Sequence, residues 1–251
     1  MSDPAQPAPA RVPARVVSLV PSLTEAVAET VPGLLVAATN WCTHPAGLDV
    51  ARLGGTKNPD VAGVVATRPD LVVVNSEENR APDIDALRAA GLRVHVTDPE
   101  TVPQALAQLR TLLRLLGASR VGWLDVAERV WAQPWSGARR RALVPIWRRP
   151  WMALGRDTFA GDVLARLGVD NALAGSPERY PRADLAALTE HGPAYDLVVL
   201  PDEPYAFAVD DGPEAFAGSP CALVSGRHLT WYGPSLAEAR DVLAGQLAAA
   251  R

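Results

Sequence analysis

Side chains that can bind a ligand follow the short apolar runs of this sequence. Aromatic rings and polar groups alternate at these positions, and indole or phenol faces with a few hydrogen-bonding heads suit a large, partly planar ligand better than a small ion. In the first half of the chain the candidate ligand-binding residues are Ser22, Trp41, Lys57, Asn58, Glu78 and Arg80. In the second half they are Arg148, Trp151, Asp157, Tyr205, Trp231 and Tyr232. We expect these residues to line a ligand cleft.

Two further residues carry the side chains of metal ligands. Cys42 and His44 are separated by one residue in a predicted loop, and a thiolate with an imidazole can hold a soft or borderline metal ion. Two ligands do not complete a metal site, so packing in a polar loop is the alternative interpretation. His228 is a candidate third ligand from the second half of the chain.

Carboxylates in the same loops raise the question of acid–base chemistry. Glu77 and Glu78 form one group, and Asp157, Asp202 and Glu203 form another, but such groups are also common in solvated loops. The glycine-rich dinucleotide and phosphate motifs, the nucleophile-elbow motif and the zinc-protease motif are all absent from the sequence. We therefore expect no catalytic residues, no enzyme and no resident cofactor.

Apolar runs rich in β-branched residues, separated by helical patterns, predict parallel sheets covered on both faces. Ligands of such sheets bind beyond the carboxyl ends of the strands, where the candidate residues fall. The predicted strands cover residues 15–20, 35–39, 71–75, 93–97, 142–147, 151–154, 197–200 and 222–225. The predicted helices cover residues 83–90, 103–116, 158–167 and 235–248. Another helix is expected to begin at Ser22, because Ser22-Leu-Thr-Glu25 fits a capping box.

A helical pattern without any strand signal divides the sequence into two halves. Residues 119–138 place apolar and aromatic side chains at helical spacing, and a helix of about 20 residues is about 30 Å long. The expected fold class is thus α/β, with two parallel-sheet, Rossmann-like lobes joined by a single long helix. Trp123, Trp131, Trp135 and Trp147 are expected to anchor that helix. The predicted divisions are a disordered leader (1–13), an amino-terminal lobe (14–117), the helix (118–140) and a carboxyl-terminal lobe (141–251).

The composition limits the functions that this chain can have. It has 251 residues, a formal net charge of −4 and 48% hydrophobic residues. The negative net charge argues against binding of nucleic acid, and the hydrophobic content fits a folded globular protein. No uninterrupted apolar run of about 18 residues is present. The first residues lack a secretory apolar segment and a lipid-bearing cysteine. We therefore expect a cytoplasmic location for the sequence as written, and an extracytoplasmic one only if the true start lies upstream.

Several segments resemble the helical-backbone metal receptors, the class III periplasmic binding proteins for cobalamin, haem and ferric siderophores, and most of all the cobalamin-binding members. The resemblance covers nearly the whole chain from Arg15. The segments that carry it are 15–25 (RVVSLVPSLTE), 68–74 (RPDLVVV), 87–98 (LRAAGLRVHVTD), 155–159 (GRDTF), 164–171 (LARLGVDN) and 195–200 (YDLVVL). In such proteins aromatic residues line the cleft, some of them in loops that align with Trp41 and with Trp231 and Tyr232.

The resemblance implies a substrate-binding protein that holds a corrinoid or another metal chelate in a cleft between two lobes. It also implies an ABC transporter permease as partner and a monomeric chain. The sequence departs from the family in lacking an export signal and in having Ala62 near the position of a glutamate that docks the first lobe onto the transporter. A cytoplasmic enzyme or chaperone that handles a corrinoid or metal is therefore the alternative, and an interaction module that has lost its ligand is a third.

Overall fold

The computed structural model describes residues 11–251, and these residues divide into two compact units. Unit 1 contains the described residues up to Thr97 together with residues 111–120. Unit 2 contains residues 98–110 and 121–251. The boundary at residues 110 and 111 falls inside one helix, α4 (Val102–Leu115). Most of the predicted leader, residues 1–13, lies outside the described residues.

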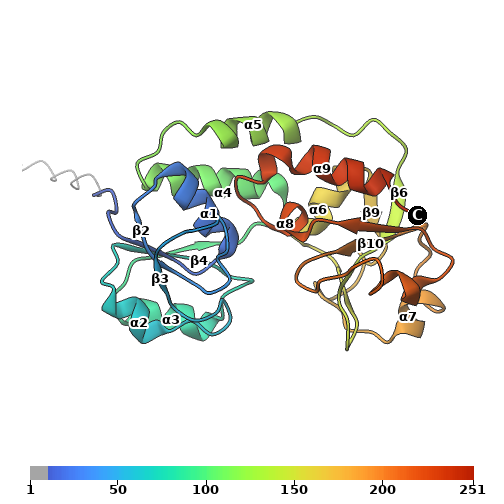
Figure 1. Ribbon diagram of the computed structural model, residues 1–251, viewed down its shortest axis with the longest axis horizontal. Helices are drawn as coiled ribbons and strands as arrows, with labels where there is room; N and C mark the ends of the chain where they lie inside the picture. Colours follow the sequence, from blue (N-terminus) through green and yellow to red (C-terminus); the bar gives the residue numbers. More distant parts are fainter. Residues whose placement is uncertain (1–10) are drawn as a thin grey trace, which may run out of the picture. The chain divides into compact units, whose positions relative to one another are not determined.

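Unit 1 is built on a five-stranded parallel sheet with the strand order β3-β2-β1-β4-β5. Strands β1 and β4 in its middle are buried along their whole length, which explains why their sequences are almost purely apolar. Helix α1 covers one face of the sheet, and α2 and α3 cover the other (Figure 1). Besides α4, the elements are β1 (Val16–Ser18), α1 (Pro21–Thr30), β2 (Leu35–Ala38), β3 (Ala51–Arg52), α2 (Val61–Ala66), β4 (Leu71–Asn75), α3 (Ala81–Ala89) and β5 (Val94–Thr97).

The predicted capping box of α1 is wrong. The helix begins at Pro21, its N-cap is Val20, and no side chain caps it. Proline is favoured in the first turn because its fixed φ suits a helix and its missing N–H is not needed there. Pro21 thus starts the helix one residue early and places Ser22 inside the first turn, where the side chain is buried.

Unit 2 contains a four-stranded parallel sheet with the order β11-β10-β6-β9 and a two-stranded antiparallel hairpin, β7–β8. The predicted strand 142–147 is divided in the structure, because Pro145 has no N–H to continue the ladder of β6. The elements are α5 (Gly122–Trp131), β6 (Arg140–Leu143), β7 (Pro145–Trp147), β8 (Met152–Ala153), α6 (Phe159–Ala165), β9 (Val169–Asn171), α7 (Leu185–Thr189), β10 (Leu197–Pro201), the 3₁₀ helix η1 (Pro213–Phe216), β11 (Cys221–Val224), α8 (Gly226–Thr230) and α9 (Leu236–Ala248).

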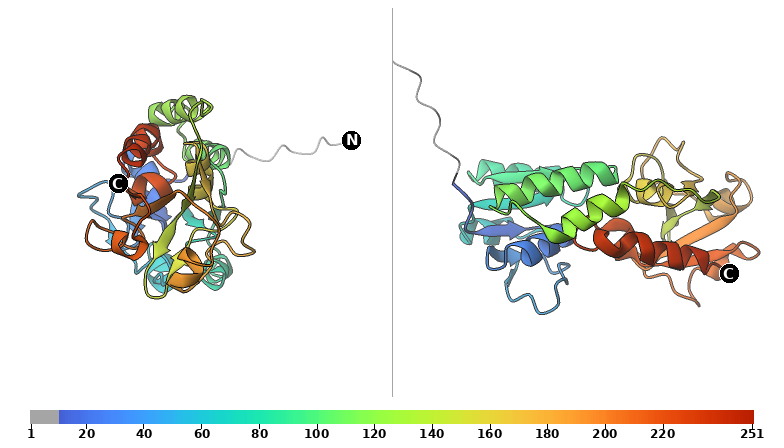
Figure 2. Two further views of the ribbon diagram at one scale, coloured as in Figure 1. Left: turned by 90° about the vertical axis from the view of Figure 1, so that its right-hand side faces the viewer. Right: turned by 90° about the horizontal axis from the view of Figure 1, so that it is seen from above.

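The long helix predicted over residues 119–138 is wrong in length, because α5 covers only Gly122–Trp131. Pro134 disfavours helical geometry in the residue before it, and the helix ends ahead of that point. Helix α5 packs on α9 (Figures 1 and 2). Trp131 is almost fully buried, and its Nε1–H donates to the carbonyl oxygen of Leu236 at 2.9 Å. Arg240 of α9 donates to the carbonyl oxygen of Val130.

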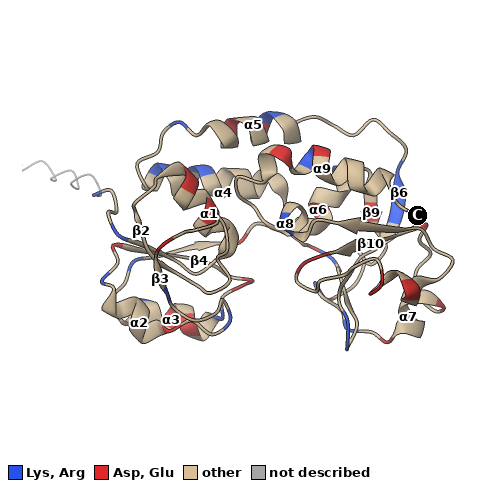
Figure 3. Ribbon diagram, in the orientation of Figure 1, with Lys and Arg blue, Asp and Glu red and all other residues tan. Residues whose placement is uncertain are grey.

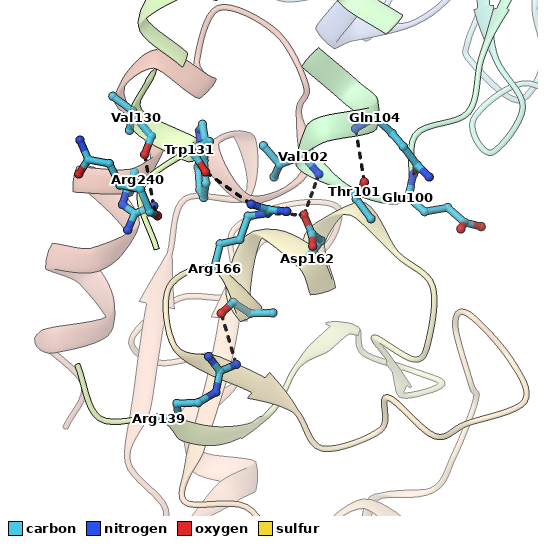
Figure 4. Close-up of polar contacts among 12 residues, drawn as sticks. Glu100, Thr101, Val102, Gln104, Val130, Trp131, Arg139, Asp162, Arg166 and Arg240 are labelled. Carbon is cyan, nitrogen blue, oxygen red and sulfur yellow. Dashed lines mark hydrogen bonds and ion pairs between the residues drawn. The ribbon is translucent and has the colours of Figure 1, made fainter. Parts of the chain in front are cut away.

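The first turn of α4 is fixed to α6 within unit 2 (Figure 4). The backbone N–H of Val102 donates to Asp162 Oδ2 at 2.8 Å, and Arg166 donates to the same oxygen at 2.7 Å. Arg166 also donates to the carbonyl oxygen of Trp131. These contacts satisfy one of the backbone donors that a helix start leaves free. Within residues 11–251, no helix has the length and apolar character needed to cross a bilayer.

Candidate functional site

The candidate residues lie in segments that follow strands of the two units. In unit 2, the segment 148–158 follows β7 of the antiparallel hairpin and contains β8, and the segment 225–232 contains α8. We call the loops 19–22, 39–45, 53–59 and 76–80 the unit 1 rim, and the loops 148–158, 202–211 and 225–232 the unit 2 rim. Parallel strands bring their carboxyl ends to one edge of a sheet, so each rim gathers residues that are distant in the sequence.

The unit 1 rim is held together by Asn79, which sequence reasoning missed. This side chain is 2% exposed, and its Nδ2 donates to the carbonyl oxygens of Leu19 at 3.2 Å and Thr56 at 2.9 Å. It therefore joins three of the four loops. Lys57 adds a third link by donating from Nζ to the carbonyl oxygen of Glu77. The available signal was an amide side chain in the loop that follows the buried strand β4 (Leu71–Asn75).

Trp41 is the most exposed aromatic side chain of the unit 1 rim, with 66% of its surface accessible. Arg52 fixes the loop that carries it, because its guanidinium donates to the carbonyl oxygens of Thr39, Cys42 and Leu48 at 2.8–3.0 Å. Gly55 lies beneath the indole, and a Cβ there would be 3.2 Å from Trp41 Nε1. The structure thus presents an open indole face on a fixed loop.

Cys42 lies beneath this loop and is fully buried. Its Sγ is within hydrogen-bonding distance of the hydroxyls of Thr24, at 3.1 Å, and Thr39, at 3.2 Å. Burial raises the pKa of the Cys42 thiol, which opposes the thiolate that a metal needs. His44 is half-buried with Nδ1 3.1 Å from the Thr43 hydroxyl. Within residues 11–251, no three His, Cys, Asp or Glu side chains gather as metal ligands.

The remaining predicted residues of the unit 1 rim differ in accessibility. Asn58 is exposed, and Glu78 is half-buried with its backbone N–H donating to Asn75 Oδ1. Arg80 is exposed and pairs with Asp83 at 2.8 Å. Ser22 is 2% exposed, and its Oγ has no hydrogen-bond partner within residues 11–251. The exposed predicted residues of this rim are thus Trp41, Lys57, Asn58 and Arg80.

Arg148, Trp151 and Tyr205 of the unit 2 rim are brought together in one cluster. Arg148 pairs with Asp211 and with Glu214, the latter at 2.6 Å, and its guanidinium lies 5.3 Å from the ring centroid of Trp151. The Tyr205 hydroxyl donates to Asp211 Oδ2 at 2.6 Å. This hydrogen bond raises the pKa of Tyr205 and lowers that of Asp211.

Two phenylalanines, Phe207 and Phe216, complete this cluster. Phe207 stacks on Trp151 with ring centroids 6.1 Å apart, and Phe216 meets the same indole edge-on at 5.3 Å. Both phenylalanines are buried, and Trp151 is half-buried. Most of the Trp151 surface therefore packs inside unit 2, with the remainder facing solvent.

Trp231 and Tyr232 lie buried in unit 2, with 9% and 4% of their surfaces exposed. Trp231 Nε1–H donates to Glu203 Oε2 at 3.1 Å, and the ring of Tyr232 meets Phe159 edge-on at 5.8 Å. The family resemblance, which aligns these two residues with aromatic residues of a cleft, did not indicate that they are buried. Asp157, in contrast, is exposed and pairs with Arg156 at 3.0 Å.

Two of the carboxylates considered for acid–base chemistry are engaged in structural hydrogen bonds. Asp202 accepts from the backbone N–H of Gly226 at 2.6 Å, and Glu203 accepts from Trp231. Basic and acidic residues are interspersed along both units (Figure 3). The rims therefore offer aromatic surface and neutral polar groups, with much of their charge already paired.

Comparisons with known proteins identify the fold. No family model matches the sequence, and no curated protein matches it. Among solved structures, the periplasmic vitamin B12 binding protein BtuF of Vibrio cholerae superposes with a TM-score of 0.75 at 17% identity, covering 94% of this chain and 97% of that one. The periplasmic haem-binding protein BhuT, in complex with two haems, gives 0.74 at 24% identity, covering 93% and 97%. The chain has their fold.

A third match extends the range of ligands found on this fold. CeuE of Helicobacter pylori, in complex with nickel and histidine, superposes with a TM-score of 0.77 at 13% identity, covering 94% of this chain and 83% of that one. Vitamin B12, haem and nickel with histidine are thus the ligands named for these three proteins.

The expected cytoplasmic location is wrong. Several of the structures that share this fold over more than nine-tenths of the chain are periplasmic proteins. The expectation depended on the absence of an apolar segment from the first residues of the sequence, and residues 1–10 lie outside the described part of the structure.

Proposed function

We propose that this protein is an extracytoplasmic solute-binding protein that binds a corrinoid or another metal chelate and delivers it to an ABC-type uptake system. The observation that carries the proposal is Trp41, an indole with 66% of its surface open on a fixed rim, in a chain with this fold. An exposed, immobilised indole loses little conformational freedom on binding a flat ligand. The titles of the matched structures, which name vitamin B12, haem and nickel with histidine, support a metal chelate as ligand.

The chemistry of the rims favours a ligand with a flat apolar face and few charges. Arg80, Arg148 and Arg156 each pair with a carboxylate, so a polyanionic ligand would have to compete with these ion pairs. The indole of Trp41 and the amide of Asn58 remain accessible. A neutral ring with amide side chains, as in a corrinoid, matches that set better than a ring with several free carboxylates.

The test is a titration of the purified protein with dicyanocobinamide, cyanocobalamin and haemin, followed by absorbance and by quenching of tryptophan fluorescence. We expect saturable binding of at least one chelate with a Kd of about 1 μM or below, equivalent to about −8 kcal/mol. Trp41→Ala should weaken that binding, and Trp135→Phe provides the matched control, because Trp135 is 39% exposed and lies outside both rims. Failure of all three chelates to bind at up to about 100 μM would refute the proposal.

A further inference from the structure

We propose that Trp147 is a further ligand-contacting residue of unit 2, and that Arg148 beside it is a positioning residue. This inference depends on the proposed function, because it assigns side chains to the same ligand. Sequence reasoning placed Trp147 among the anchors of a long helix and assigned a direct ligand contact to Arg148. The contacts of both residues in the structure support the reverse assignment.

Trp147 ends strand β7 at the beginning of the unit 2 rim, with 40% of its surface exposed. Its ring meets Tyr205 edge-on, with centroids 5.7 Å apart and an interplanar angle of 77°. One edge is therefore packed on a neighbouring rim residue while much of the indole stays open. An exposed aromatic ring with a fixed neighbour is a common binding hot spot.

Arg148 joins the β7–β8 hairpin to the segment 205–216. Its guanidinium pairs with both Asp211 and Glu214 and lies against the Trp151 ring, and only 16% of its side chain is exposed. Tyr205, the ring partner of Trp147, donates its hydroxyl proton to Asp211 as well. The same carboxylate thus holds both Arg148, which follows Trp147 in the chain, and Tyr205, which contacts the Trp147 ring.

These contacts determine what Arg148 and Trp147 can offer a ligand. Two carboxylates already occupy the fork of Arg148 that would recognise a carboxylate or phosphate. Trp147, fixed by its neighbours, offers an apolar face. We therefore infer that this part of unit 2 stacks on the flat part of a chelate, and that Arg148 contributes by holding the hairpin.

The experiment measures chelate affinity for Trp147→Ala, Trp147→Phe, Arg148→Met and the double variant, using the chelate that binds the wild-type protein most tightly. We expect Trp147→Ala to weaken binding about 20-fold, Trp147→Phe to weaken it less, and both to keep the urea midpoint of the wild type. Trp135→Ala is the control, because Trp135 is exposed to the same degree, 39%, but lies between α5 and β6.

The double variant distinguishes positioning from direct contact. If Arg148 acts through Trp147, Arg148→Met should weaken binding in the wild-type background and have little effect in the Trp147→Ala background. Independent, additive losses would show that Arg148 contacts the ligand itself and would overturn its assignment. Unchanged affinity of Trp147→Ala alongside a loss in Trp41→Ala would overturn the role of Trp147 and leave the proposed function intact. A wild-type protein that binds no chelate would overturn both.

Discussion

Arg52→Met should loosen the loop that carries Trp41. The substitution keeps a long apolar side chain but removes the three hydrogen bonds from the guanidinium to the carbonyl oxygens of Thr39, Cys42 and Leu48. Hydrogen bonds from charged groups contribute about 1.5–3 kcal/mol each, and partial solvent exposure lowers that contribution. Taking about 1 kcal/mol for each bond gives about 3 kcal/mol, which corresponds to about 150-fold in an opening equilibrium.

Amide hydrogen exchange measures this opening directly. The reporter amides are those of Cys42 and Thr43, which donate within the loop at 3.2 and 2.9 Å. We expect their exchange to accelerate by about two orders of magnitude in Arg52→Met, while amides of β4 keep the wild-type rate. Arg88→Met is the matched control, because Arg88 makes a 3.5 Å pair with Asp85 on the surface of α3. Equal exchange in the two variants would show that Arg52 does not hold the loop.

Three further predictions concern buried groups. Trp231→Ala should lower the free energy of unfolding of unit 2 by about 3 kcal/mol in a urea titration, because it leaves a cavity in place of a buried side chain. A loss of chelate affinity at unchanged stability would contradict a structural role for Trp231. Replacing Cys42 and His44 together by alanine should leave the metal content of the purified protein unchanged by mass spectrometry, because hydroxyls enclose the thiol, and a loss of metal would establish them as ligands. Burial and the charge of Arg93 lower the pKa of His95 from 6.5 in the folded protein. As the pH drops, the unfolded chain therefore binds a proton first, and the free energy of unfolding should fall below about pH 6.5. His95→Gln should flatten this pH dependence of stability, and an unchanged slope would contradict the prediction.

The elements predicted most accurately were those whose sequence pattern matches a fully buried environment. Residues 71–75 were predicted as a strand, and β4 has these bounds with every residue buried. The failures occurred at prolines, where two local rules compete. Pro21 displaced Ser22 from the N-cap position, and Pro145 divided a predicted strand into two elements. The sequence shows that each proline lacks an N–H. It does not show whether this effect outweighs the capping-box pattern at Ser22 or the apolar strand pattern at residues 142–147.

For the candidate site, the sequence predicted the location of the residues better than the role of each side chain. Placing the candidates after the strands was sufficient to find both rims, because a parallel sheet fixes the edge at which they meet. Exposure was not predictable: Trp41 and Trp231 were both expected in loops that follow strands, yet one is 66% and the other 9% exposed. Long-range contacts decide this difference, such as the hydrogen bond between Trp231 and Glu203, 28 residues apart. For the same reason the contacts by which Asn79 and Phe207 hold the rims from within were not predicted.

Lys57 has a practical consequence for experiments on this protein. It is the single lysine among 251 residues, and it lies on the unit 1 rim with its ammonium anchored on the Glu77 carbonyl. Acylating reagents that target primary amines therefore have one side chain to modify, and it stands at the candidate binding surface. The rate of that modification gives a footprint of cargo occupancy without any engineered label.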